Sequence, residues 1–317
     1  MAFSTANRVI AAAIPGMCLA KNNWATAGET LARLAESVTA GALPVSTTDA
    51  QPDVEASLWF VRAVQIFAKE GCGDEQLIAR LRETTKQIVQ EFISEQGVGG
   101  MVMDHGGMLA GAPLRINALW YSALGTAAVD LKAVGDKSSD HFDRLAGRFR
   151  RAFVKTFWCE EHLCICSPEV RQGEEEKGGG GDSHGELPDP DQLILPILPT
   201  SPLPRTKQRQ MILTLQERLL KGCEIGIWLQ HPVLGRVESV VHRAWLAVSI
   251  VNIADNRAAA MPEAQAILAP LKPLLNSATG IAAFYRDGKP LGEPDRVTAA
   301  EVMGAMGAMG TVGGEGG

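Results

Sequence analysis

The sequence lacks the features that mark several large classes of protein. No apolar run in its 317 residues reaches the ~18 residues of a membrane-spanning helix, so we expect no membrane partner. The 30 basic and 36 acidic residues give a formal net charge of -6, which offers no positive surface to the phosphates of a nucleic acid. Aromatic residues make up only 5%, so small apolar side chains must fill much of the core.

Cysteines are too sparse for the disulfide framework of a small secreted domain. Four potential metal ligands crowd into one short stretch, namely Cys159, His162, Cys164 and Cys166. A tetrahedral metal site usually takes its ligands from two well-separated pairs. The pattern therefore favours a strand or loop edge with reduced thiols, and a metal site is the alternative. We predict no metal, no cofactor and a cytoplasmic location.

The N-terminal segment has two interpretations. Arg8 and the apolar run from Val9 to Ala20 resemble a secretory signal peptide. The run contains Pro15 and Gly16, however, and leads directly into an amphipathic helix. We therefore expect it to belong to the folded domain.

Helical periodicity dominates the remaining chain, beginning with a stripe of apolar residues from Trp24 to Val38. Segments that are apolar on nearly every side alternate with amphipathic ones. The apolar segments are 56–68, 117–130 and 244–253, and the amphipathic segments are 75–94, 140–157 and 262–276. A ring of inner helices enclosed by outer helices produces this alternation. The pattern predicts an all-α fold, an α/α toroid, with a helical solenoid as the alternative.

One domain is expected over residues 1–303. Within it, residues 167–190 are rich in glutamate, glycine and proline, so we expect a mobile loop there. Residues 304–317 are rich in glycine, alanine and methionine and should form a frayed tail.

Short motifs add a more specific signal. The segment Glu55–Phe60 reads E-A-S-L-W-F, Val102–Asp104 reads V-M-D, and Ile116–Tyr121 reads I-N-A-L-W-Y. These motifs resemble D-A-S-L-W-F, W-M-D and I-N-A-L-W-Y in the glucosidase domain of prokaryotic glycogen-debranching enzymes, the amylo-α-1,6-glucosidase family. Weaker similarity follows the family's order over almost the whole chain, at residues 15–20, 189–192 and 284–290.

The resemblance implies an (α/α)6 toroid whose inner-helix loops form a sugar pocket, and an α-glucan or another oligosaccharide as the partner. Family members release the α-1,6-linked branch-point glucose of glycogen. An inverting reaction of this kind needs a general acid and a general base roughly 6.5–9.5 Å apart, with a water molecule between. Asp104 matches the family's acid. Its alternative is a turn aspartate that caps the next element.

The resemblance also implies a set of residues that contact the substrate: Arg8, Glu55, Trp59, Arg115, Asn117, Trp120, Gln192 and Trp245. Trp59 and Trp120 would offer flat faces to a sugar ring, and core packing is the alternative for both. Asn117 interrupts an apolar helix, so its amide needs a hydrogen-bond partner. That partner is either a sugar hydroxyl or the wall of the pocket.

Several positions depart from the family pattern. Ala283 or Phe284 stands where the family has the glutamate that acts as the base. Charges are reversed at Arg115 and Asp189, and these two residues could form a compensating ion pair.

Candidates for a replacement base lie near the lost glutamate in the sequence. Asp287 comes first because it occupies the matching Asp-Gly turn, ahead of Glu293 and Glu301, and its alternative is a plain turn residue. Loss of a base costs ~10²–10⁴ in rate. Two functions follow: an amylo-α-1,6-glucosidase, or a catalytically impaired homologue that binds carbohydrate or acts as a scaffold. A terpene or lanthipeptide cyclase is not supported, because the required metal ligands are not arranged here.

Overall fold

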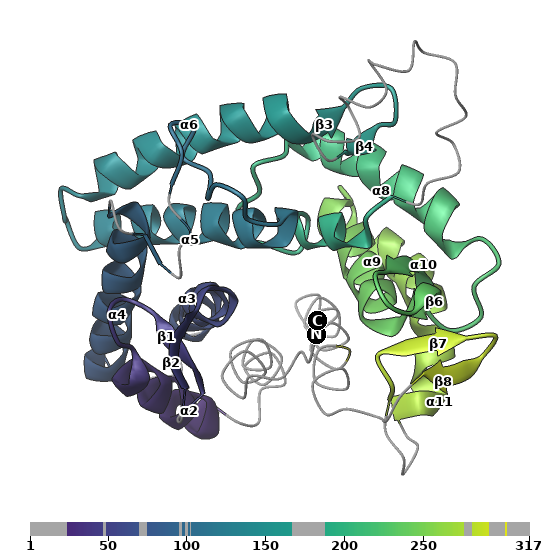
Figure 1. Cartoon of the computed structure of the whole chain (residues 1–317), viewed down its shortest axis with the longest axis horizontal. Coiled ribbons are helices and arrows are strands. Elements are labelled where there is room, and N and C mark those ends of the chain that lie inside the picture. Colours follow the sequence, from purple (N-terminus) through teal and green to yellow (C-terminus); the bar gives the residue numbers. More distant parts are fainter. Residues whose placement is uncertain are drawn as a thin grey trace. The chain divides into compact units, whose positions relative to one another are not determined.

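The computed structural model describes residues 24–46, 49–69, 75–94, 97–98, 101, 103–166, 188–275, 281–291 and 302. The chain divides into two compact units. Figure 1 labels most of the helices and strands of both units. One comprises residues 1–152 and 198–202, and the other comprises residues 153–197 and 203–317. The predictions for Arg8, the N-terminal apolar run, Glu293, Glu301, the tail and most of the expected 167–190 loop lie outside the described residues.

Over its described residues, the first unit is helical apart from one hairpin. Its elements are α2 (Trp24–Ser37), β1 (Leu43–Ser46), β2 (Asp49–Asp53), α3 (Val54–Lys69), α4 (Glu75–Ile93), α5 (Leu114–Ala133) and the greater part of α6 (Ser139–Phe157). Helix α3 packs against α2, α4 and α5. Helices α3 and α5 are buried on most sides, whereas α4 buries the single stripe that contains Leu81, Ile88 and Phe92. The predicted alternation of apolar and amphipathic helices is confirmed in this unit.

Hydrogen bonds fix the start of α3 to the preceding hairpin. The Asp53 carboxylate accepts a hydrogen bond from the N–H of Ala56 at 2.9 Å, which satisfies an amide of the first turn. The Ser57 hydroxyl accepts from the N–H of Leu43 at 2.9 Å and donates to the carbonyl of Asp53 at 2.7 Å. The residues that open α3 are therefore held in a defined position.

The second unit combines helices with short strands. Its elements after α6 are β3 (Trp158–Cys159), β4 (Cys164–Ile165), η2 (Pro190–Ile194), α8 (Arg205–Leu220), β5 (Ile227–His231), β6 (Gly235–Ser239), α9 (Val240–Ile253), α10 (Arg257–Leu268), η3 (Ala269–Leu271), α11 (Lys272–Leu275), β7 (Phe284–Arg286) and β8 (Lys289–Leu291). Strands β5, β6, β7 and β8 form an antiparallel sheet in that order. Helix α9 packs against α8, α10 and η2, and its nearly complete burial matches its apolar sequence.

The predicted predominance of helix is confirmed, and the cysteine-rich stretch expected as a strand or loop edge contains β3 and β4. The other antiparallel strands were not predicted, because they have three to five residues, too few to show a clear period of two. The expected helix at 262–276 differs as well, because α10 ends at Leu268 and the chain continues through η3 into α11. Pro270 and Pro273 lack the amide hydrogen that a continuous helix needs there. In the described part of the chain, we find no helix with the length and apolar character to cross a membrane.

Candidate functional site

Asp104 lies in a tight turn that precedes α5. Its N–H donates to the carbonyl of Met108 at 2.7 Å, and its Oδ1 accepts from the N–H of Met108 at 2.9 Å. The Gly107 N–H also donates to the Asp104 carbonyl at 3.0 Å. The carboxylate therefore closes the turn, as the alternative interpretation requires. The side chain is only half-buried, and among the described residues its Oδ2 accepts no hydrogen bond.

Asn117 attaches the segment after the Asp104 turn, residues 109–112, to α5. Its Oδ1 accepts from the N–H of Leu109 at 2.8 Å, and its Nδ2 donates to the carbonyls of Leu109 at 3.2 Å and Ala112 at 3.0 Å. Asn117 is itself buried, so these bonds satisfy the amide inside an apolar helix. Asn117 thus braces the wall of the turn, which is one of the two interpretations of the sequence.

We expect Asn117→Ala to lower the free energy of unfolding by ~2–3 kcal/mol, because it removes three hydrogen bonds and leaves the buried N–H of Leu109 without its side-chain acceptor. Urea unfolding followed by circular dichroism measures this loss. Asn252→Ala is the matched control, since that amide makes one hydrogen bond, to the carbonyl of Pro196, and should cost only ~1 kcal/mol. Equal losses in the two variants would argue against the bracing role.

Trp120 holds the same turn from the core. Its Nε1 donates to the carbonyl of Gly107 at 3.0 Å, and its ring stacks on Phe92 with centroids 5.3 Å apart. The ring is fully buried, so it has no face left for a sugar. The core-packing alternative therefore describes Trp120, and the I-N-A-L-W motif supports the Asp104 turn through both Asn117 and Trp120.

An ion pair joins the first turns of α3 and α5. Arg115 Nη2 lies 3.0 Å from the carboxylate of Glu55, and the Trp59 Nε1 donates to Glu55 Oε1 at 3.4 Å. Glu55 is buried, whereas Arg115 and Trp59 are half-buried. Glutamate is favoured at the positive end of a helix and arginine is not, so the pair offsets the unfavourable position of Arg115. Polar side chains and one indole thus gather at the N-terminal ends of two packed helices, and one of these helices, α5, also anchors the Asp104 turn through Asn117 and Trp120.

Two other predicted site residues, Gln192 and Trp245, belong to the second unit. Gln192 is fully buried, accepts from the N–H of Ile165 at 2.9 Å and donates to the carbonyl of Asp189 at 2.7 Å, so it braces β4 against η2. Trp245 is buried on α9. The Asp189 carboxylate caps η2 by accepting from the N–H of Asp191 at 2.9 Å, and the suggested Arg115–Asp189 pair stays a prediction.

A hydrogen-bonded chain that the sequence did not reveal runs through His242. Its Nδ1 lies 2.7 Å from the hydroxyl of Ser239, and its Nε2 lies 2.8 Å from the carboxylate of Asp191. The three residue types are those of a hydrolytic triad, but Ser239 is only 2% exposed. A serine that no substrate can reach is not a nucleophile, so the chain fixes the β6–α9 corner to η2.

Asp287 occupies the hairpin turn between β7 and β8. Asp287 and Gly288 both have positive φ, 49° and 72°, which is the geometry of a type I′ turn and the reason for an Asp-Gly sequence. The side chain is exposed. The plain-turn alternative accounts for this residue fully. Asp287 and Asp104 belong to different units, and the catalytic role of Asp287 stays a prediction.

Two substitutions separate a turn role from a catalytic role at position 287. Asp287→Asn should leave stability within ~0.5 kcal/mol of the parent, because asparagine tolerates the left-handed conformation. Asp287→Val should cost ~1–2 kcal/mol, because a β-branched side chain does not tolerate it. Thermal unfolding measures both effects. If Asp287→Asn instead preserved stability but abolished glucose release from a branched glucan, Asp287 would be the missing base.

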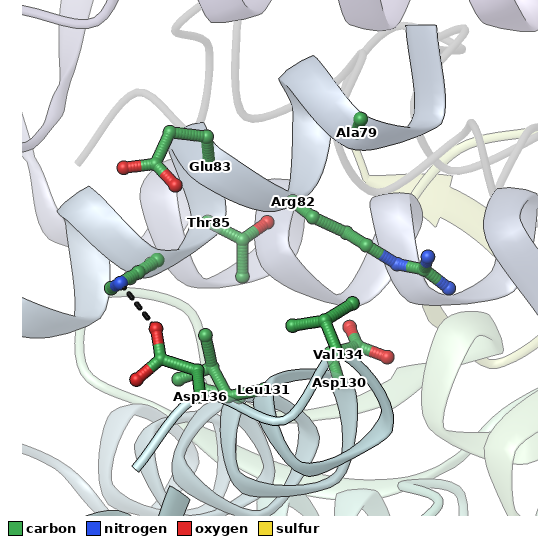
Figure 2. Close-up of a pocket in the computed structure, with 10 residues that line it drawn as sticks. Ala79, Arg82, Glu83, Thr85, Asp130, Leu131, Val134 and Asp136 are labelled. Carbon is green, nitrogen blue, oxygen red and sulfur yellow. Dashed lines mark hydrogen bonds and ion pairs between the residues drawn. The ribbon is translucent and has the colours of Figure 1, made fainter. Parts of the chain in front are cut away.

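A cavity of about 190 Å³ lies between α4 and the C-terminal half of α5. Figure 2 shows Arg82 from α4 and Asp130 from α5 among its lining residues. Burial raises the pKa of Asp130, and the charge of Arg82 opposes this shift. Asp130 is thirteen residues after Asn117, about 20 Å along the helix. The cavity contains no predicted site residue, so we do not assign the sugar site to it.

Comparison with known proteins gives two positive findings. The sequence profile described as amylo-alpha-1,6-glucosidase matches residues 3–223. A solved structure described as a wild-type glycosidase superposes with a TM-score of 0.59 and covers 96% of this chain and 87% of its own, at 12% sequence identity. At that identity the likeness concerns the fold alone. No curated protein matches the sequence.

Proposed function

This chain belongs to the amylo-alpha-1,6-glucosidase family, and from that membership we propose that it is a glycoside hydrolase acting on the α-1,6 branch points of a glycogen-like α-glucan. Asp104 is the general acid, and turnover is slow because the position of the base carries no carboxylate. The proposal includes an (α/α)6 toroid over residues 1–303, a tail at 304–317 and a cytoplasmic site of action.

The observation that carries the proposal is the construction of the Asp104 turn. One carboxylate oxygen closes the turn, the other accepts no hydrogen bond from the described residues, and α5 holds the turn through Asn117 and Trp120. A rigidly held acid whose second oxygen has no hydrogen-bond partner among the described residues suits proton transfer to a positioned leaving group. An aspartate that served only as a cap would not need this additional anchoring.

The reaction is an inverting hydrolysis. Protonated Asp104 gives its proton to the glycosidic oxygen as the bond from that oxygen to C1 of the glucose breaks. A water molecule attacks C1 from the opposite face and loses a proton to solvent, since Ala283 and Phe284 cannot accept it. The products are glucose with inverted anomeric configuration and a debranched chain. The Glu55–Arg115 pair supplies partners for sugar hydroxyls, and Trp59 supplies an apolar face.

Glucose release from an α-1,6-branched limit dextrin tests this function. The full chain should release glucose slowly but above the rate of a heat-inactivated sample, and linear maltooligosaccharides should yield none. Absence of glucose from folded protein at high concentration, in the presence of measurable dextrin binding, would refute the hydrolase.

A second function is favoured by one specific observation: the sequence-matched Asp287 has the conformation and exposure of a plain turn residue. The chain would then be a catalytically impaired homologue that binds carbohydrate or acts as a scaffold. Calorimetric titration with branched maltooligosaccharides distinguishes the two functions. Binding that Trp59→Ala weakens, without any glucose release, would establish the binding protein.

A further inference from the structure

We propose that Cys159, His162 and Cys166 form a binding site for Zn²⁺ or a similar thiol-seeking divalent ion, with Cys164 as the fourth ligand. The first three residues place one potential ligand atom each within 4.8 Å of the others. In a tetrahedral site with metal–sulfur bonds of about 2.3 Å, neighbouring sulfur ligands lie about 3.8 Å apart. For these three residues, closing the remaining gap requires side-chain movements of about 1 Å.

The hairpin topology explains why residues so close in sequence can surround one ion. Cys159 pairs with Cys164 in the β3–β4 register, and the N–H of Cys166 donates to the carbonyl of Phe157 at 2.9 Å. Opposed residues, and residues two apart on a strand, share one face of a hairpin. The three thiols therefore share one face. The short spacing along the sequence argued against a metal site. The hairpin, however, places Cys159 on one strand and Cys164 on the opposite strand, so the ligands come from two separate strands.

The turn of the hairpin directs two backbone donors at one thiol. The backbone N–H groups of Glu161 and His162 both hydrogen-bond to the sulfur of Cys159. Leu163 adopts a left-handed conformation with φ of 50°, which turns the chain back into β4. His162 is thereby placed beside Cys159 and Cys166, where a ring nitrogen completes the set of ligands.

Burial and charge also suit a thiolate-bound ion. Cys159 and Cys164 are buried, and Cys166 and His162 are half-buried, so an ion can enter and then be shielded from water. Cys166 hydrogen-bonds with the thiols of both Cys159 and Cys164. Three thiolates and a divalent ion carry one net negative charge, which the nearby positive charge of Arg218 offsets. Each thiol that becomes a ligand releases its proton to the solvent.

Such an ion would have a structural role. Strand β4 packs against α8, and Lys207 of α8 lies over the Trp158 ring at 4.4 Å and hydrogen-bonds to Glu160 at 2.5 Å. A metal clamp at Cys159, His162, Cys164 and Cys166 would lock the hairpin in the conformation that makes these contacts. With four protein ligands the site has no open position for substrate, which is typical of structural rather than catalytic zinc.

The test measures metal content in the full-length chain, purified under reducing conditions and passed through metal-free buffer. We expect about one zinc per chain by mass spectrometry, and Co²⁺ should produce the thiolate charge-transfer and visible bands of a tetrahedral site. Cys159→Ser and Cys166→Ser should lower the zinc content at least tenfold. His162→Ala, in the turn, should weaken zinc affinity tenfold or more while leaving the circular dichroism spectrum unchanged. Cys223→Ser is the matched control and should retain the metal, because Cys223 lies outside the cluster.

Three outcomes would overturn the site. They are wild-type protein without stoichiometric zinc under reducing conditions, equal zinc content in Cys166→Ser and the control, and a disulfide among the three thiols in place of metal. None of these measurements depends on carbohydrate turnover. Failure of the metal site is therefore distinguishable from failure of the proposed hydrolase.

Discussion

Asp104→Asn should lower the rate of glucose release from a branched limit dextrin by ~10²–10⁴, because it removes the proton that the leaving oxygen needs. The substitution keeps an oxygen that can accept the hydrogen bond from the Met108 N–H, so the turn should survive. Initial rates at saturating dextrin measure the effect on turnover. Calorimetric titration should show nearly unchanged affinity for the same sugar.

Asp143→Asn is the matched control for this experiment, since it removes an equal charge from an exposed position of α6. It should leave the rate of the parent protein unchanged. If Asp104→Asn released glucose as fast as the parent, Asp104 would be only the cap of its turn, and the proposed acid would be wrong.

Ala283→Glu should raise the rate of glucose release by ~10²–10⁴, because it restores a carboxylate where the family has its catalytic base. Ala283 is half-buried directly before β7, and its carbonyl accepts from the N–H of Val240 at 3.4 Å, so the backbone there is held in place. Deprotonation of the attacking water is the role of the second carboxylate in an inverting hydrolysis. Initial rates measure the gain, and proton NMR of the first glucose released should detect the inverted anomer.

Ala283→Gln is the control for side-chain size, because glutamine has the shape of glutamate without its basicity. Only the glutamate variant should gain activity. Phe284→Glu tests the other alignment with the family, in which the base falls at position 284. This variant should lose some packing, because the centroids of the Phe284 and His231 rings lie 5.0 Å apart. No gain in either glutamate variant would mean that more than the base has been lost.

The long helices were predictable because burial leaves a direct trace in the sequence. Helices α3 and α5 are apolar on nearly every side, and α4 carries one apolar stripe, so their periodicity indicates both helix and environment. The strands were not predictable, because β7 and β8 have three residues each. Their Asp-Gly turn was visible as a motif, but nothing nearby showed that it closes a hairpin.

The candidate site was predictable by residue type and less so by role. The sequence left two roles open for Asn117 and Trp120, contact with sugar or support of the fold, and in the structure both support the Asp104 turn. A sequence motif identifies residues but not their roles. It does not distinguish a residue that contacts the ligand from a residue that positions a ligand-contacting neighbour. The partner of Arg115 could not be deduced either, because Glu55 is 60 positions away and meets it only through the packing of α3 against α5.

The account is tested most directly by a crystal structure of the Asp104→Asn protein with a singly branched maltooligosaccharide. We predict that the side chain at position 104 hydrogen-bonds to the α-1,6 glycosidic oxygen, with a sugar ring against Trp59 and hydroxyls on the Glu55–Arg115 pair. Ordered sugar bound elsewhere, with position 104 in contact only with its own turn, would contradict the proposed site.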